Sequence, residues 1–177
     1  GGGGGGALGG GADERDRFVE KVGVQARVEA ARALLDLLPG RARTHRSPDG
    51  AHPRFAENRL VYLSFSEKGE GGNSTAVARG TLSADNKKLS GVEVIFSQKP
   101  KEDSTMHFGS RLVFGRDGTL FVTLGERFLF DPAQDPGGHL GKIVRIQPDG
   151  AVPKDNPFVD RKDARPEIWS YGHRNVQ

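Results

Sequence analysis

Short stretches in which apolar and polar residues alternate recur from residue 59 onwards, and turn-forming residues separate them. A period of two predicts strands with one buried face. Gly, Pro, Asn and Asp residues lie between the stretches at 71–73, 117–118, 136–138 and 148–150, where they favour tight turns. The predicted strands are Leu60–Phe65, Ala76–Leu82, Val92–Phe96, Arg111–Gly115, Thr119–Gly125, Lys142–Ile146 and Ile168–Tyr171. Short strands at this density predict an all-β propeller or sandwich.

The strands at 111–115 and 119–125 flank the turn Arg116-Asp117-Gly118 and predict a tight hairpin. The residues just before and just after such a hairpin lie close together, so His107 and Glu126 are expected to meet. A carboxylate on one imidazole nitrogen selects the tautomer and makes the other nitrogen a better base. On the hairpin alone, a loop histidine beside a solvated surface glutamate is the competing interpretation.

The first fifty residues have a different pattern. Gly1–Gly11 is almost entirely glycine, a leader with few side chains to pack. In Asp13–Leu38 the apolar residues fall on one helical stripe, which predicts a helix capped by Asp13 and ended near Gly40. The leader lacks the basic start and apolar centre of a signal peptide.

Composition excludes several classes of function. The net charge of the 177 residues is +3, and basic residues are interspersed with acidic ones, so nucleic-acid binding is not indicated. The chain has no cysteine, which excludes disulfides and thiolate metal sites. No apolar run approaches the roughly 20 residues of a membrane-spanning helix.

Two segments, Thr105–Glu126 (TMHFGSRLVFGRDGTLFVTLGE) and Glu167–Gln177 (EIWSYGHRNVQ), resemble the glucose/sorbosone dehydrogenase family. Further matches, in the same order, are HPRFAENRLVYLSFS, ARGTL and AQDPGGHLGKIVRIQPDGAVPKDNPF. The resemblance runs from about His52 to Gln177. The family comprises soluble quinoproteins that carry pyrroloquinoline quinone (PQQ) on a six-bladed β-propeller. The resemblance implies that residues 51–177 form a partial propeller of two to three blades, since a blade takes ~40–50 residues. It also implies that the chain is a fragment of the whole enzyme.

The resemblance also implies roles for four residues. His107 matches the general base that removes the proton from the anomeric hydroxyl of the sugar. Glu126 matches an acidic residue that orients this histidine. Arg174 and Asn175 match an Arg-Asn pair that contacts the quinone oxygens, where a guanidinium stabilises developing negative charge. Without the flanking residues, Arg174 and Asn175 are also compatible with an ordinary turn.

Other polar residues are expected to have structural roles. Arg111 is expected to form an ion pair, His173 to be packed or hydrogen-bonded, and His139 to be a solvated loop residue. Lys142 and Asp155 are expected to make contacts between strands and in turns.

The chain departs from the family pattern in several places. The glutamine that relatives place near the substrate has no equivalent before His52, and Met106 stands where some relatives have a cofactor-contacting aspartate. The segments that hold calcium and clamp the PQQ carboxylates would follow Gln177, so no metal ligand is assigned. Residues 1–50 do not resemble the family; a misread reading frame and a genuine helical appendage both explain them.

The resulting hypothesis is a fragment of a PQQ-dependent sugar dehydrogenase that oxidises aldoses to lactones by general-base-assisted hydride transfer, inactive on its own. A non-catalytic propeller binding module and a calcium-dependent, lactonase-like propeller are the alternatives. The family implies PQQ and calcium as cofactors, an aldose as substrate and a periplasmic or secreted location. The electron acceptor is left open.

Overall fold

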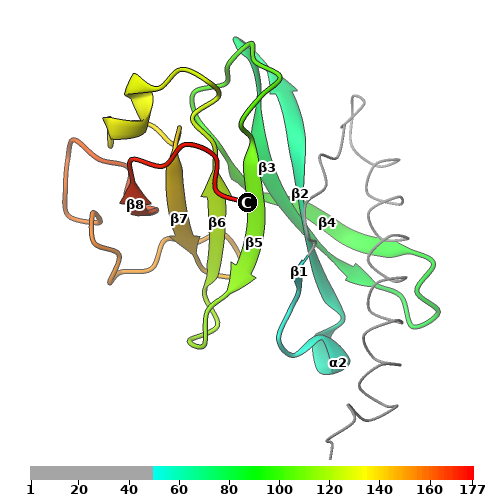
Figure 1. Ribbon diagram of the computed structural model, residues 1–177. Helices are drawn as coiled ribbons and strands as arrows, with labels where there is room; N and C mark the ends of the chain where they lie inside the picture. The colour runs from blue at the N-terminus through cyan, green and yellow to red at the C-terminus, as the bar shows by residue number, and fades with distance from the viewer. Residues whose placement is uncertain (1–49) are drawn as a thin grey trace, which may run out of the picture.

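The computed structural model describes residues 50–177, which form two four-stranded antiparallel sheets (Figure 1). The first sheet has the order β1-β2-β3-β4, with β1 Gly50–Ala51, β2 Leu60–Gly69, β3 Gly72–Leu82 and β4 Leu89–Ser97. The second has the order β5-β6-β7-β8, with β5 Gly109–Phe114, β6 Leu120–Leu124, β7 Lys142–Ile146 and β8 Ile168–Tyr171. Strands adjacent in sequence are therefore adjacent in each sheet, as in the blades of a propeller.

All seven predicted strands are present. The last two have the predicted bounds, whereas β2 and β3 extend further toward their shared turn. The sequence pattern missed three short elements: β1, the helix α2 (Phe55–Asn58) and a 3-10 helix at Asp131–Gln134. The predicted leader and helix at Asp13–Leu38 lie outside the described residues. The all-β partial propeller is confirmed, with two blades in residues 50–177.

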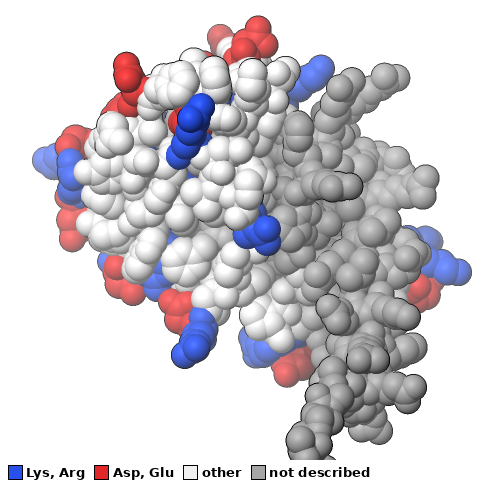
Figure 2. Space-filling view, viewed as in Figure 1, with Lys and Arg blue, Asp and Glu red and all other residues white. Residues whose placement is uncertain are grey.

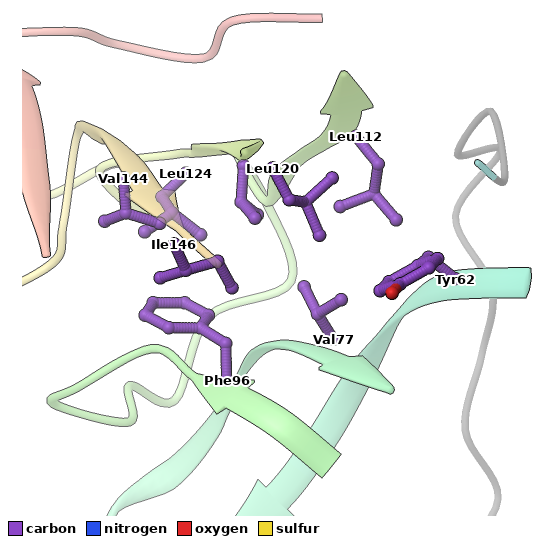
Figure 3. Close-up of a cluster of buried hydrophobic side chains, with 9 residues drawn as sticks. Tyr62, Val77, Phe96, Leu112, Leu120, Leu124, Val144 and Ile146 are labelled. Carbon is purple, nitrogen blue, oxygen red and sulfur yellow. The ribbon is translucent and has the colours of Figure 1, made fainter. Parts of the chain in front are cut away.

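The two sheets pack face to face over an apolar core (Figure 3). Alternate residues of β5, β6 and β7 point toward the first sheet, as a period of two requires. Each large apolar side chain buried there stabilises the fold by about 1.5–3 kcal/mol relative to an exposed one. The buried members of this core are Tyr62, Val77, Phe96, Leu112, Leu120, Val122, Leu124, Val144 and Ile146.

Polar contacts also join the sheets on the side where β5 begins. Thr75 Oγ1 of β3 donates to the carbonyl of Phe108 at 2.8 Å, and Ser64 Oγ of β2 donates to the carbonyl of Ser110 at 2.7 Å. Near the opposite end of β2, the Tyr62 hydroxyl donates to the carbonyl of Pro148 at 2.9 Å. The first sheet therefore holds the chain segment that contains His107.

The two outward sheet faces differ. The face of the first sheet that points away from the shared core is buried and carries residues such as Leu63, Ala78 and Leu89. The outward face of the second sheet carries Val113 and Trp169, each more than two-fifths exposed. Propeller blades stack through such faces.

On the face shown in Figure 2, basic and acidic side chains of the described residues are interspersed around uncharged surface. Among the described residues, Lys101 forms an ion pair with Glu67, and Arg161 forms one with Asp163. Within residues 50–177, no helix has the length and hydropathy needed to cross a membrane.

Candidate functional site

The β5–β6 hairpin brings His107 and Glu126 together, as its sequence predicts. Nδ1 of His107 is hydrogen-bonded to Oε1 of Glu126 across nineteen positions of the chain. The His107 side chain is 18% exposed and that of Glu126 only 1%. The carboxylate is therefore buried beneath an imidazole that remains accessible from the surface, and the solvated-glutamate interpretation is wrong.

The Glu126 carboxylate also accepts two backbone hydrogen bonds. The Phe128 amide donates to Oε1 at 3.1 Å, and the Phe130 amide donates to Oε2 at 2.6 Å. Burial disfavours the charged form, but the hydrogen bonds from His107 and the two amides outweigh it, so the pKa of Glu126 lies below its usual range. An ionised carboxylate only accepts hydrogen bonds, so Nδ1 of His107 carries the proton. Nε2 of the neutral ring then carries the lone pair.

Glycine at position 125 allows the close approach of the histidine backbone. A Cβ atom on Gly125 would lie 1.6 Å from the His107 carbonyl oxygen and 2.2 Å from its carbon. The Gly125 amide instead donates to the Phe108 carbonyl at 3.1 Å. Any side chain at 125 would displace His107 from Glu126.

The backbone around the site is unusual. His107 has φ 49°, in the left-handed region that non-glycine residues rarely adopt. Of seven non-glycine residues with positive φ in the described part of the chain, five lie here: His107, Ser110, Arg127, Phe128 and Phe130. Each such conformation costs on the order of 1–3 kcal/mol and typically marks a functional site.

The segment after β8 reaches the same site. The Glu126 amide donates to the Arg174 carbonyl at 2.9 Å, and the Gly109 amide donates to Oδ1 of Asn175 at 3.0 Å. Thr123 Oγ1 donates to the Val176 carbonyl at 2.9 Å. The structure therefore brings all four predicted site residues to one end of the second sheet.

Two aromatic residues that the sequence analysis did not single out connect these groups. The Phe128 ring lies edge-on to the His107 ring, with 5.1 Å between centroids. The Arg174 guanidinium carbon lies 5.6 Å from the Phe128 ring and 5.4 Å from the Phe130 ring. Both rings are about half exposed. The apolar run FLF, directly after a charged pair and outside any strand pattern, was the sequence feature that could have indicated these two residues.

The expectation that His139 is a solvated loop residue is wrong. This residue is 2% exposed and packs edge-on against Phe96 at 5.2 Å. Its Nδ1 accepts the Lys99 amide at 2.9 Å, and its Nε2 bonds Oε1 of Glu167 at 2.7 Å. The loop before β7 folds under the end of β4, a contact over forty positions that local sequence does not encode.

Of the remaining polar residues, Arg111 is exposed and forms no ion pair within residues 50–177, so that expectation is wrong, whereas the others have structural contacts. Nζ of the fully buried Lys142 donates to the carbonyls of Pro132, Ala133 and Leu140, which confirms its predicted turn contacts. His173 is hydrogen-bonded to Ser170 Oγ at 2.8 Å, also as predicted. Across residues 50–177, no three side chains of His, Asp or Glu gather as metal ligands.

Comparison with known proteins identifies the family. The model of the glucose/sorbosone dehydrogenase family matches residues 50–177. Aldose sugar dehydrogenase YliI of Escherichia coli is 47% identical over 126 residues, 71% of this chain and 34% of that protein. The chain thus spans about a third of the length of this relative.

Solved structures agree. A crystal structure of a glucose dehydrogenase is 50% identical, with a TM-score of 0.70 over 72% of this chain and 37% of that one. The PQQ-bound aldose sugar dehydrogenase of Streptomyces coelicolor is 29% identical, with a TM-score of 0.60 over 73% of this chain and 36% of that one. By its family match, its relatives and its paired sheets, the chain belongs to the glucose/sorbosone dehydrogenase family.

Proposed function

We propose that this chain carries the general base and one wall of the cofactor site of a PQQ-dependent aldose dehydrogenase, which oxidises an aldose to its lactone. The observation that carries the proposal is the buried Glu126 carboxylate on Nδ1 of the accessible His107. A carboxylate–imidazole pair of this kind is suited to proton abstraction near neutral pH.

The pairing of His107 with Glu126 supports its role as the base. The proton on Nδ1 is held by Glu126, so Nε2 accepts the proton of the anomeric hydroxyl. As the imidazole becomes positively charged, the buried carboxylate stabilises that charge more strongly than water would. Glu126 in turn keeps its own position through the Phe128 and Phe130 amides.

The groups at 174 and 175 fit the oxygen atoms of an ortho-quinone. The Arg174 guanidinium is a permanent cation with several donors. The rings of Phe128 and Phe130 restrict the directions in which this guanidinium can point. Oδ1 of Asn175 accepts bonds from Gly109 and Gln177, so its Nδ2 is the atom that donates to a ligand. When bound, PQQ supplies the acceptor for the hydride that leaves the anomeric carbon.

Calcium and a periplasmic or secreted location belong to the same proposal and rest on the family resemblance. The structure assigns no calcium ligands within residues 50–177. Calcium dependence is tested by adding a chelator to the reconstituted protein, and location by fractionation of the producing cells.

The decisive experiment is reconstitution of the complete protein that contains this chain with PQQ and calcium. A dehydrogenase reduces an artificial dye when glucose or another aldose is added, and its His107→Ala variant does so ~10²–10⁴-fold more slowly. A binding module retains sugar but reduces no dye. A lactonase-like protein opens lactones without PQQ, and either of these results would refute the proposal.

A further inference from the structure

The loop after β6 buries a second charged residue directly beside Glu126. Arg127 is 1% exposed, and its hydrogen-bond acceptors within residues 50–177 are oxygens of neutral groups. Its Nε is buried with no hydrogen-bond partner among those residues. Burial lowers the pKa of Arg127 to about 10, and the charge of Glu102 offsets this only in part. A buried cation without a bonded anion destabilises a fold, so its presence calls for another explanation.

The contacts of Arg127 lie on both sides of His107. On one side, Nη1 donates to the Met106 carbonyl at 2.9 Å, and Nη2 donates to the Ser104 carbonyl. On the other side, the guanidinium carbon lies 3.5 Å from the centroid of the Phe108 ring. One planar group therefore holds the residues before and after a histidine whose φ is 49°.

Arg127 also links this loop to its surroundings. Nη2 donates to Oδ1 of Asn73 on β3, so the first sheet contributes to the same arrangement. The Arg127 carbonyl accepts a hydrogen bond from the hydroxyl of Ser104 at 2.8 Å. Arg127 and Ser104 therefore each donate a hydrogen bond to the other's carbonyl. Lysine would provide the charge but could not reproduce this planar fork of donors.

We propose that Arg127 is the positioning residue that holds His107 in register with Glu126. This inference rests on the proposed function, because it concerns the same base. Arg127 acts through the Met106 carbonyl and the Phe108 ring, and it does not touch the substrate. Loss of its guanidinium frees His107 to leave the left-handed conformation and to lose its carboxylate partner.

A second buried arginine provides a matched control. Arg145 is 7% exposed and lies beside the β5–β6 turn, at the opposite end of β6 from Glu126. It is paired with Asp117 and Asp155, at 2.7 and 2.9 Å. Arg145→Gln removes a buried guanidinium from β7 without touching the His107 loop.

The first measurement uses the protein without cofactor. Proton nuclear magnetic resonance detects the Nδ1 proton that His107 donates to Glu126, and His107→Ala identifies its signal. We expect Arg127→Gln to broaden or remove this signal and Arg127→Lys to weaken it, whereas Arg145→Gln leaves it intact. In Arg127→Ala, added guanidinium at concentrations that do not denature the protein should restore the signal.

The second measurement is turnover of the complete, reconstituted protein. A displacement of about 1 Å costs up to ~10²-fold in rate, so we expect kcat of Arg127→Gln to fall ~10–10²-fold with little change in KM for the sugar. The acidic limb of the pH–rate profile should also move to lower pH, because the protonated His107 imidazole loses its carboxylate partner. Arg145→Gln should lower the melting temperature while kcat and the profile stay unchanged.

The outcomes separate the two proposals. If Arg127→Gln keeps the Nδ1 proton signal and loses only thermal stability, as Arg145→Gln does, Arg127 is not a positioning residue. If the signal depends on Arg127 but no variant, nor the parent protein, oxidises sugar, the positioning holds and the proposed function fails. Should Arg127→Gln not fold, Arg127→Lys gives the same comparison.

Discussion

Gly125→Ala tests whether close approach of two backbones sets the position of His107. The added Cβ would lie 1.6 Å from the His107 carbonyl oxygen, whereas real Cβ contacts essentially never fall below 3.0 Å. The two segments must therefore separate by at least about 1.4 Å (3.0 − 1.6 Å). The obstructing atoms belong to backbone, so no side-chain rotation relieves the overlap.

The expected consequences are a loss of stability and a loss of rate. Separation breaks the 3.1 Å hydrogen bond from the Gly125 amide to Phe108, and overpacking of this kind costs about 1–3 kcal/mol. Misplacement by about 1 Å can cost 10²-fold in rate, so kcat of the reconstituted protein should fall ~10²-fold or more. Urea unfolding measures the first effect and dye reduction the second.

Gly118→Ala is the control. Gly118 has φ +82°, but nothing beyond its chain neighbours lies within 4 Å of its Cβ position, so alanine there adds backbone strain without overlap. It should destabilise the hairpin by on the order of 1 kcal/mol and leave kcat unchanged. If Gly125→Ala turned over sugar like the parent protein, the backbone contact would not position the base and this reasoning would be wrong.

Three further predictions concern the His107–Glu126 pair. His107→Ala should lower kcat by ~10²–10⁴-fold, the usual effect of losing a general base, with a smaller effect on PQQ affinity measured by titration; near-normal turnover would remove His107 from this role. Glu126→Gln should lower kcat and move the acidic limb of the pH–rate profile to lower pH, because the protonated imidazole loses its charged partner; an unchanged profile would contradict the pairing. Because the pKa of folded Glu126 lies below its ordinary value of 4.5, its stabilisation is present above about pH 4.5 and is lost as the pH falls through the lowered pKa. Urea unfolding from pH 6 downwards should therefore show a smaller loss of stability in Glu126→Gln than in the parent, and parallel curves would refute this.

The features that the sequence determined by itself are local ones. The bounds of β7 and β8, the turn at Asp117-Gly118 and the meeting of His107 with Glu126 all follow from strand periodicity and a short turn. A hairpin determines which residues face each other because few residues separate its strands. The segment EIWSYGHRNVQ assigned Arg174 and Asn175 to the site only through its resemblance to the family. Their contacts with Glu126 and Gly109 are seen only in the folded chain.

The tertiary structure decided which polar groups contact each other when they lie far apart in the chain. Asn73 bonds Arg127 across 54 positions, Lys99 bonds His139 across 40, and Gly109 bonds Asn175 across 66. Charge and polarity place such residues at the surface by default, and only the packing of one sheet against the other removes them from water. A sequence pattern records which face of a strand is apolar, but not which distant carbonyl will accept a buried guanidinium. The burial of Arg127, and with it the support of His107, is therefore visible only in the folded chain.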